Sequence, residues 1–121
     1  MIEIEFYETS NGKCPVAEYL DTLSSSEAQK VAWVIELIQT LERPPSKFLK
    51  KLKSTDDLWE IRIQYSGNIF RLLSFFDDEK LLIANHGFTK KSQKTPKNDI
   101  GIAEERKKDY YLRKGELGES N

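Results

Sequence analysis

The sequence has little of what several common protein classes require. Its 121 residues include one cysteine, Cys14, and one histidine, His86, so the chain can form no internal disulfide and offers no recognisable zinc or iron–sulfur framework. Long hydrophobic runs are absent, and the apolar residues of the first six positions alternate with glutamates, which fits neither a signal peptide nor a membrane span. We therefore expect one cytoplasmic domain, residues 1–121, that is stabilised by packing, needs no cofactor and does not contact a membrane.

The chain also has little net charge, but its acidic and basic residues are unevenly distributed along the sequence. Nineteen basic and twenty acidic residues give a net charge of -1, yet residues 1–42 hold -6, residues 43–98 hold +6 and residues 99–121 hold -1. The balanced total argues against a protein that coats any nucleic acid, whereas the central block favours a focused anion-binding patch. The alternative is that solvated lysines simply flank the strands, which is the commoner situation for a lysine run taken alone.

The hydrophobic pattern of the first half predicts one strand followed by two helices. Alternation over residues 2–7 is typical of a half-buried strand. Pro15 suits the first turn of a short helix, and Ser24 with Glu27 forms a capping box at the start of a longer one, which Pro44 must end. We expect the two helices to form an antiparallel pair that covers one side of a sheet.

The second half predicts most of that sheet. We interpret residues 48–57 as an irregular connection, because their apolar and lysine residues follow no clear period. Three strand patterns follow at residues 58–64, 69–76 and 81–88, joined by two short turns, so the sheet should be largely an antiparallel meander. A last helix is expected over about residues 96–112, with a frayed tail at 113–121. The predicted class is α+β.

Two arginines fall opposite each other in this meander. A tight turn at residues 66–67 pairs positions whose numbers sum to 133, which places Arg62 directly across from Arg71. Like charges in that arrangement destabilise a sheet by roughly 0.2–1 kcal/mol, whereas a bound phosphate would stabilise it, because the planar guanidinium fork matches phosphate oxygens. The alternative is that Glu60 pairs with either arginine and that each arginine is an ordinary surface group. Both arginines together, near Lys90, favour an anion site.

Proton transfer and base stacking have several candidates. Neutral His86 could accept a proton near pH 7, or it could only bond the backbone at the end of a buried strand, and no orienting partner is visible in the sequence. Glu60 is a competing base that the neighbouring cations would weaken. Tyr65 and Phe88, near strand ends, are the best candidates for stacking on a nucleobase.

Three segments resemble a known family. The stretch Asp-Leu-Trp-Glu-Ile-Arg at 57–62 with the Leu-Lys at 52–53, the Phe-Arg-Leu at 70–72, and the run His-Gly-Phe-Thr-Lys-Lys-Ser-Gln-Lys-Thr-Pro at 86–96 resemble the phage-derived Gp49-like, or HigB-type, toxins of the RelE/ParE superfamily. The resemblance covers nearly the whole chain. It implies a RelE-like fold and a bacterial type II toxin–antitoxin system. In such a system the toxin cleaves mRNA on the ribosome and a helix-turn-helix, HigA-like antitoxin silences it, with DNA reached only through the antitoxin complex.

The resemblance also implies roles for individual residues. Arg62 and Arg71 fall where RelE-type toxins bind the scissile phosphate, and Lys90 or Lys91 falls near another catalytic cation. Glu60 stands where a relative can have a lysine, so the general base stays open among Glu60, His86 and Tyr65. The expected catalytic set is Arg62, Arg71, Lys90, Glu60 and His86. The expected RNA-contacting set is Lys50, Lys53, Tyr65, Phe88, Lys91 and Lys94.

The expected reaction needs no metal. An RNA 2'-hydroxyl attacks the adjacent phosphate, leaving a 2',3'-cyclic phosphate and a free 5'-hydroxyl, while cations neutralise the developing charge. Two alternatives remain at this stage: a ParE-like toxin that poisons DNA gyrase, and an RNA-binding module without cleavage.

Overall fold

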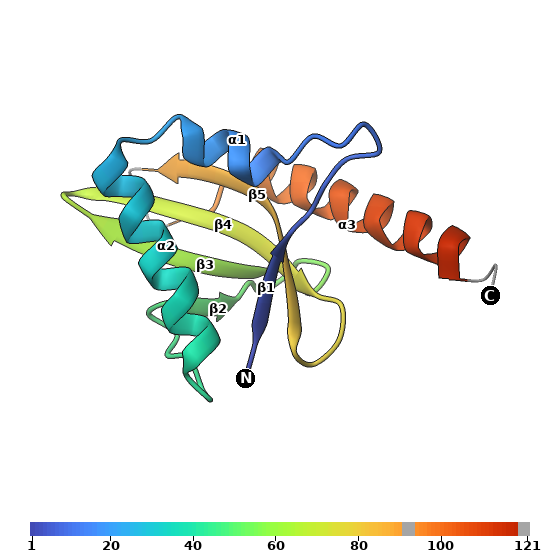
Figure 1. Ribbon diagram of the computed structural model, residues 1–121, viewed down its shortest axis with the longest axis horizontal. Coiled ribbons are helices and arrows are strands. Elements are labelled where there is room, and N and C mark those ends of the chain that lie inside the picture. The colour runs from blue at the N-terminus through green and yellow to red at the C-terminus, as the bar shows by residue number, and fades with distance from the viewer. Residues whose placement is uncertain (91–93, 119–121) are drawn as a thin grey trace.

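The structure, a computed structural model, describes residues 1–90 and 94–118, and it describes the side chains as far as residue 115. The chain forms five strands and three helices within those residues. In order they are β1 (Glu3–Phe6), α1 (Pro15–Asp21), α2 (Ser25–Thr40), β2 (Leu49–Lys51), β3 (Trp59–Tyr65), β4 (Asn68–Phe76), β5 (Leu81–Lys90) and α3 (Lys97–Gly118). The strands form one sheet in the order β1-β5-β4-β3-β2 (Figure 1), in which β1 is parallel to β5 and the remaining pairs are antiparallel. The α+β prediction is confirmed.

Local sequence signals explain the two helices on the first face. Pro15 occupies the first turn of α1, where its missing N–H costs no hydrogen bond. The predicted capping box begins α2: the Ser24 hydroxyl accepts from the Glu27 N–H, and the Glu27 carboxylate accepts from the Ser24 N–H at 2.9 Å. Cys14, half-buried, precedes α1. Both helix starts therefore follow from the sequence.

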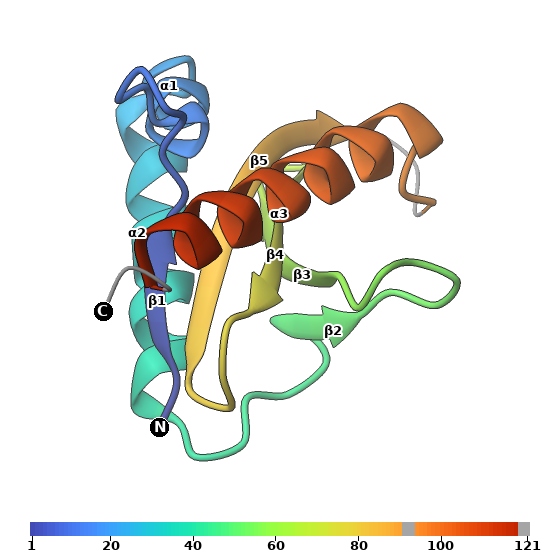
Figure 2. The ribbon, with the colours of Figure 1, turned by 90° about the vertical axis from the view of Figure 1, so that its right-hand side faces the viewer.

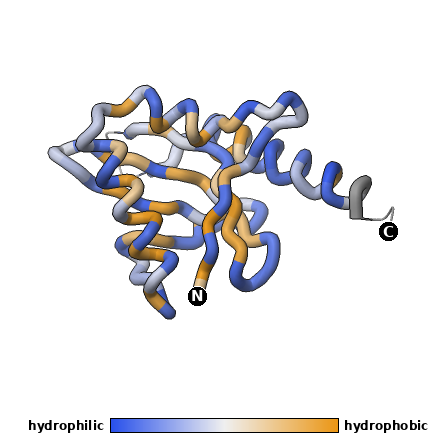
Figure 3. The backbone as a smooth tube through the Cα atoms, in the orientation of Figure 1, coloured by the Kyte–Doolittle hydropathy of each residue, from blue (hydrophilic) through white to orange (hydrophobic). Residues whose placement is uncertain are grey.

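The sheet is covered on both faces. One apolar cluster lies between the sheet and α1 with α2, and includes Val31, Val34 and Ile38 of α2. A second lies between the other face and α3, where Ala103 packs with Leu73 and Phe75 of β4, among others. Figure 2 shows α3 crossing that second face, and Figure 3 shows the hydrophobic residues concentrated in the central strands and α2, while α3 is largely hydrophilic. Within the described residues, α3 packs on β5 and β4, and the site described below lies on the same face, toward β3.

Two boundaries differ from the sequence prediction. Leu49–Lys51 is a strand, not an irregular connection, and pairs with Trp59–Ile61 of β3. Three residues, two of them lysines, are too few to show alternation, and an edge strand can be defined by its partner alone. The last helix continues to Gly118, well past residue 112. Ion pairs to Arg113 from Asp109, at 2.9 Å, and to Lys114 from Asp77, at 2.5 Å, stabilise the turn where fraying was expected.

No helix in the described part of the chain is both long enough and apolar enough to cross a membrane.

Candidate functional site

The two arginines occupy the predicted register. Arg62 of β3 lies directly opposite Arg71 of β4, and Glu60 lies opposite Leu73 in the neighbouring pair. Alternation along β3 therefore places Glu60 and Arg62 on the face opposite the cluster of α1 and α2. The register prediction is confirmed, and the like-charged pair is part of the fold.

A buried carboxylate lies between the two guanidinium groups. Glu60 Oε1 is 3.7 Å from Arg62 Nε and 3.6 Å from Arg71 Nε, and the side chain of Glu60 is only 4% exposed. These distances are too long for hydrogen bonds, so the attraction is mainly Coulombic. Glu60 also accepts a hydrogen bond from the Thr95 hydroxyl, which precedes α3. A carboxylate between two cations offsets the repulsion that the sheet register creates.

The two arginines differ in their exposure to solvent. Arg71 has 5% of its side chain exposed, and its Nη1 donates to the Phe70 carbonyl at 3.1 Å and to the Ile63 carbonyl at 3.5 Å. Burial lowers the pKa of Arg71, an effect that Glu60 opposes and Arg62 adds to, although a guanidinium stays charged in proteins. Arg62 retains 22% exposure and donates to the Ser46 carbonyl at 3.3 Å. Arg62 is thus the member of the pair that a ligand can reach.

Lys90 brings a third cation to this region. It ends β5, pairs in register with Ile69 of β4, and is 7% exposed. Desolvation by burial lowers the pKa of Lys90, Glu60 raises it, and Arg71 and Arg62 lower it further. These electrostatic effects show that Lys90, Glu60 and the arginines form one interacting group, which we call the Glu60 cluster.

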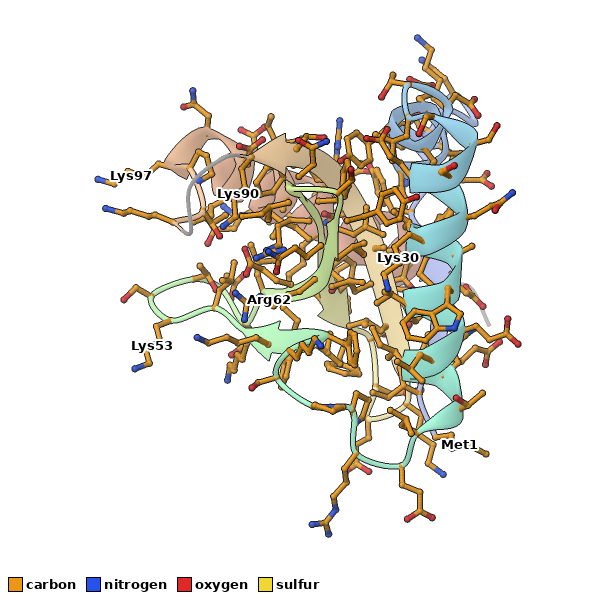
Figure 4. The ribbon with its side chains drawn as sticks, turned by 90° about the vertical axis from the view of Figure 1, so that its left-hand side faces the viewer. Met1, Lys30, Lys53, Arg62, Lys90 and Lys97 are labelled. Carbon is orange, nitrogen blue, oxygen red and sulfur yellow. The ribbon has the colours of Figure 1, made fainter. Side chains whose placement is uncertain are left out.

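Two projecting segments flank this cluster. Figure 4 shows Arg62 and Lys90 between the β2–β3 loop, where Lys53 lies, and the start of α3 at Lys97. Both segments extend beyond the sheet on the same side in Figure 2. Lys50 in β2, Lys53 in the β2–β3 loop and Lys94 before α3 are exposed, as an RNA-contacting role would require, and Lys91 lies outside the described residues.

His86 has the partners that the sequence did not reveal. Its Nε2 is 2.7 Å from Asp99 Oδ1, and its Nδ1 is 3.2 Å from Arg106 Nη1, both from α3. It lies opposite Leu73 in β4, which in turn lies opposite Glu60 in β3, so two strand spacings, about 10 Å, separate His86 from Glu60. The residues from α3 are far away in sequence, and no local pattern could have indicated them. The geometry ties His86 to α3 and does not bring it into the Glu60 cluster.

The two aromatic candidates have different environments. Tyr65, at the end of β3, is 38% exposed, so its ring is accessible. Phe88 is 9% exposed, packs in the α3 cluster and stacks on His86 at 5.8 Å between ring centroids. The expectation that Phe88 offers a stacking surface is therefore corrected, because α3 covers the end of β5 on this face.

A cavity next to the cluster involves residues that the sequence reasoning missed. It measures about 420 Å³ and lies between α2, the segment before β2, and β3. The lining residues are Lys30, Trp33, Val34, Lys47, Phe48, Arg62, Ile63, Gln64 and Arg71. Trp33 is 51% exposed. One signal was present in the sequence: Trp33 falls outside the apolar stripe of its helix, where a large aromatic residue is unusual.

No cluster of three or more His, Cys, Asp or Glu side chains within residues 1–90 and 94–115 could hold a metal ion.

A model of the phage-derived Gp49-like protein family (DUF891) matches residues 18–108, which are 91 of the 121 residues and include all five members of the expected catalytic set. No curated protein matches the sequence significantly.

Proposed function

Since this chain belongs to the phage-derived Gp49-like family, a toxin-like family, we propose that it is a HigB-type toxin of the RelE superfamily. In this proposal it is the toxin of a type II toxin–antitoxin system and inhibits translation by cleaving mRNA on the ribosome. The observation that supports this most directly is the meeting of Arg62, Arg71 and Lys90 on one face of the sheet, where Arg62 remains 22% exposed. One carboxylate, Glu60, lies among these three cations, so the group keeps an excess of positive charge that a phosphate would offset.

The proposed mechanism divides the work among the cations. Arg62, the accessible arginine, binds a non-bridging oxygen of the scissile phosphate. Lys90, which is nearly as buried as Arg71, adds positive charge without contacting the phosphate directly as the phosphorane forms. Arg71 is too buried to be the main phosphate ligand, so it holds Glu60 and supports Arg62 from behind. The 2'-hydroxyl of the substrate gives its proton to a general base and attacks the phosphorus. The bond from phosphorus to the 5'-oxygen breaks, that oxygen takes a proton from a general acid, and the products are a 2',3'-cyclic phosphate and a free 5'-hydroxyl.

Glu60 is better suited to positioning than to proton transfer. It is enclosed by two arginines and by the Thr95 hydroxyl, and only 4% of its side chain is exposed, so a substrate hydroxyl has little access to it. His86 is held by Asp99 and Arg106, two strand spacings from Glu60. Tyr65 is the accessible candidate. The pH dependence of cleavage would identify the residue that accepts the first proton.

The proposed partners follow from the same surface. The ribosome would present mRNA to the open face, and the exposed Lys50, Lys53 and Lys94 would contact the RNA backbone. A HigA-like antitoxin would inhibit by covering this face with acidic residues, and DNA would be bound only by the antitoxin part of that complex.

The test is to express the chain, map the 5' ends of cellular mRNA, and repeat the cleavage with translating ribosomes and with free RNA. Cleavage should leave 2',3'-cyclic phosphates, and a substrate with a 2'-deoxy nucleotide at the cleaved position should resist. Arg62→Ala should reduce the cleavage rate by about 10²–10³-fold, and Arg62→Lys should restore only part of it, because lysine lacks the bidentate fork. Intact transcripts together with a DNA-damage response would indicate gyrase poisoning instead.

A further inference from the structure

The cavity beside the Glu60 cluster combines two properties that single-stranded RNA recognition needs. Four of its nine lining residues are cations, Lys30, Lys47, Arg62 and Arg71. None of the nine, which come from the described part of the chain, is acidic. Two more, Trp33 and Phe48, are aromatic. Basic grooves with aromatic side chains bind the phosphates and stack the bases of single strands.

The aromatic pair is held in a defined geometry. The rings of Trp33 and Phe48 meet edge to face, with centroids 6.2 Å apart and planes at 78°. Lys30 Nζ lies 4.3 Å from the centroid of the Trp33 ring, and Lys47 Nζ lies 5.5 Å from that of Phe48. Each ring is thus paired with a cation. Trp33 is nevertheless 51% exposed. Exposing this large apolar ring to water is unfavourable, and the packing of α2 against the sheet does not require it.

The position of the cavity connects it to the proposed chemistry. Arg62 contributes both to the cavity lining and to the Glu60 cluster. Its backbone N–H donates to the Phe48 carbonyl at 2.8 Å, which fixes the segment before β2 against β3. Figure 4 shows Lys30 on the sheet side of α2, the side on which Arg62 lies. A phosphate bound at Arg62 would therefore have an aromatic pocket next to it.

We propose that this cavity, built by Trp33, Phe48, Lys30 and Lys47 next to Arg62, is a nucleobase-binding subsite. In this subsite the base of a nucleotide would stack on Trp33, and the phosphate of the same nucleotide would be bound at Arg62. The inference rests on the proposed function, since it names the part of the substrate that the same site would hold. A volume of about 420 Å³ leaves room for a base and its ribose. Trp33 would then influence which base is preferred beside the cleaved bond.

The binding test separates the base from the phosphate. Trp33 and Trp59 are the two tryptophans of the chain, so in Trp59→Phe the intrinsic fluorescence reports on Trp33 alone. Adenosine and uridine 5'-monophosphate should quench this fluorescence saturably. Ribose 5-phosphate, which has the sugar and phosphate but no base, should bind about tenfold more weakly or worse. Equal affinity for ribose 5-phosphate would overturn the subsite.

A matched pair of substitutions provides the control. Measured by calorimetry, Trp33→Phe should keep nucleotide affinity within about threefold, whereas Trp33→Leu, which loses the aromatic face, should weaken it about tenfold and leave ribose 5-phosphate binding unchanged. Unchanged nucleotide binding by Trp33→Leu would contradict the proposal. Stronger binding of an octaglutamate peptide than of an RNA octamer would also contradict it, and would make the cavity a surface for an acidic protein segment.

Cleavage assays distinguish this inference from the proposed function. If the chain cleaves RNA, Trp33→Leu should cleave with a raised KM, because nucleotide binding is weaker, and should change the base preference next to the cleaved bond. An unchanged preference would overturn the subsite alone. If the chain does not cleave RNA but still binds nucleotides through Trp33, the subsite stands and the nuclease proposal fails.

Discussion

At the scale of single residues, the site consists of cationic side chains, and burial by the fold disfavours the charges of two of them. Arg71 is buried with one carboxylate partner, Glu60, which it shares with Arg62. Lys90 is nearly buried as well, and its lowered pKa shows that its surroundings on balance disfavour its charge. Such arrangements are typical of functional sites, where stability is lower than the same backbone could reach.

The difference in burial between the arginines predicts a difference in stability. Arg71→Ala should lower the free energy of unfolding by about 2–3 kcal/mol, because it removes the buried arginine beside Glu60 and leaves that carboxylate buried with less compensating charge. Arg62→Ala should cost under about 1 kcal/mol, since its side chain is partly solvated. Urea unfolding measures both. Adding Glu60→Gln to Arg71→Ala should recover part of the loss, and equal small losses for the two arginines would contradict this description.

Replacing Lys90 should separate stability from activity. Lys90→Met keeps the length of the side chain and removes a charge that burial disfavours, so the free energy of unfolding should rise at neutral pH while cleavage falls. Because the pKa of Lys90 is lower in the folded state than in the unfolded state, its charge destabilises the protein below the folded pKa. That cost disappears as the pH rises toward the ordinary lysine value of 10.5.

The measurement for Lys90 is urea unfolding of both proteins from pH 6 to pH 10. The stability advantage of Lys90→Met should shrink as the pH rises. An advantage that grows with pH would mean that the lysine stabilises the fold.

At the scale of elements, the packing of α1 on β5 depends on one close approach. A Cβ atom on Gly87 would lie 2.2 Å from Cδ2 and 2.7 Å from Cγ of Tyr19 in α1. The Tyr19 hydroxyl and the Thr89 hydroxyl share a hydrogen bond at 2.8 Å, so the ring cannot move without losing that contact. The glycine therefore sets the distance between the helix and the strand.

Gly87→Ala should lower the free energy of unfolding by about 1–3 kcal/mol, because α1 or the Tyr19 ring must shift. Thermal and urea unfolding measure the loss. In a Tyr19→Ala background the same glycine substitution should cost much less, since the space it needs is already open. The same cost in both backgrounds would show that the contact with Tyr19 is not the cause.

Elements with a local signal could be predicted from the sequence, and elements defined by a distant partner could not. Ser24 and Glu27 indicate the start of α2 by themselves, and the turn at residues 66–67 determines the register of Arg62 and Arg71. The strand Leu49–Lys51 exists because β3 offers it an edge. The same distinction holds for the site, since the arginine pair is a local consequence of a hairpin.

The rest of the site depends on contacts between distant segments. Burial of Phe88 and the partners of His86 come from α3, and the position of Trp33 opposite Phe48 depends on how α2 packs on the sheet. Side chains separated by many residues meet only after the layers have packed, which no period in the sequence encodes.

At the scale of the whole molecule, the net charge of -1 conceals a cationic region with strong local effects. The acidic segment, residues 1–42, includes all of α1 and α2, yet Lys30 of α2 lines the cavity together with Lys47, Arg62 and Arg71. A focused patch of this kind governs association with an anion more than the total charge does, because salt screens distant charges first.

This segregation predicts steep salt dependence for a protein with almost no net charge. If an RNA octamer contacts the patch through two to four phosphates, the slope of log affinity against log salt should be about -1.4 to -2.8. Lys30→Gln should make that slope shallower by about 0.7, since one fewer counterion is released. Lys80→Gln, an exposed lysine in the β4–β5 turn, changes the net charge equally and serves as the control. Fluorescence anisotropy from 50 to 300 mM salt measures all three proteins, and equal effects of the two lysines would show that the total charge of the molecule, and not the patch, attracts the RNA.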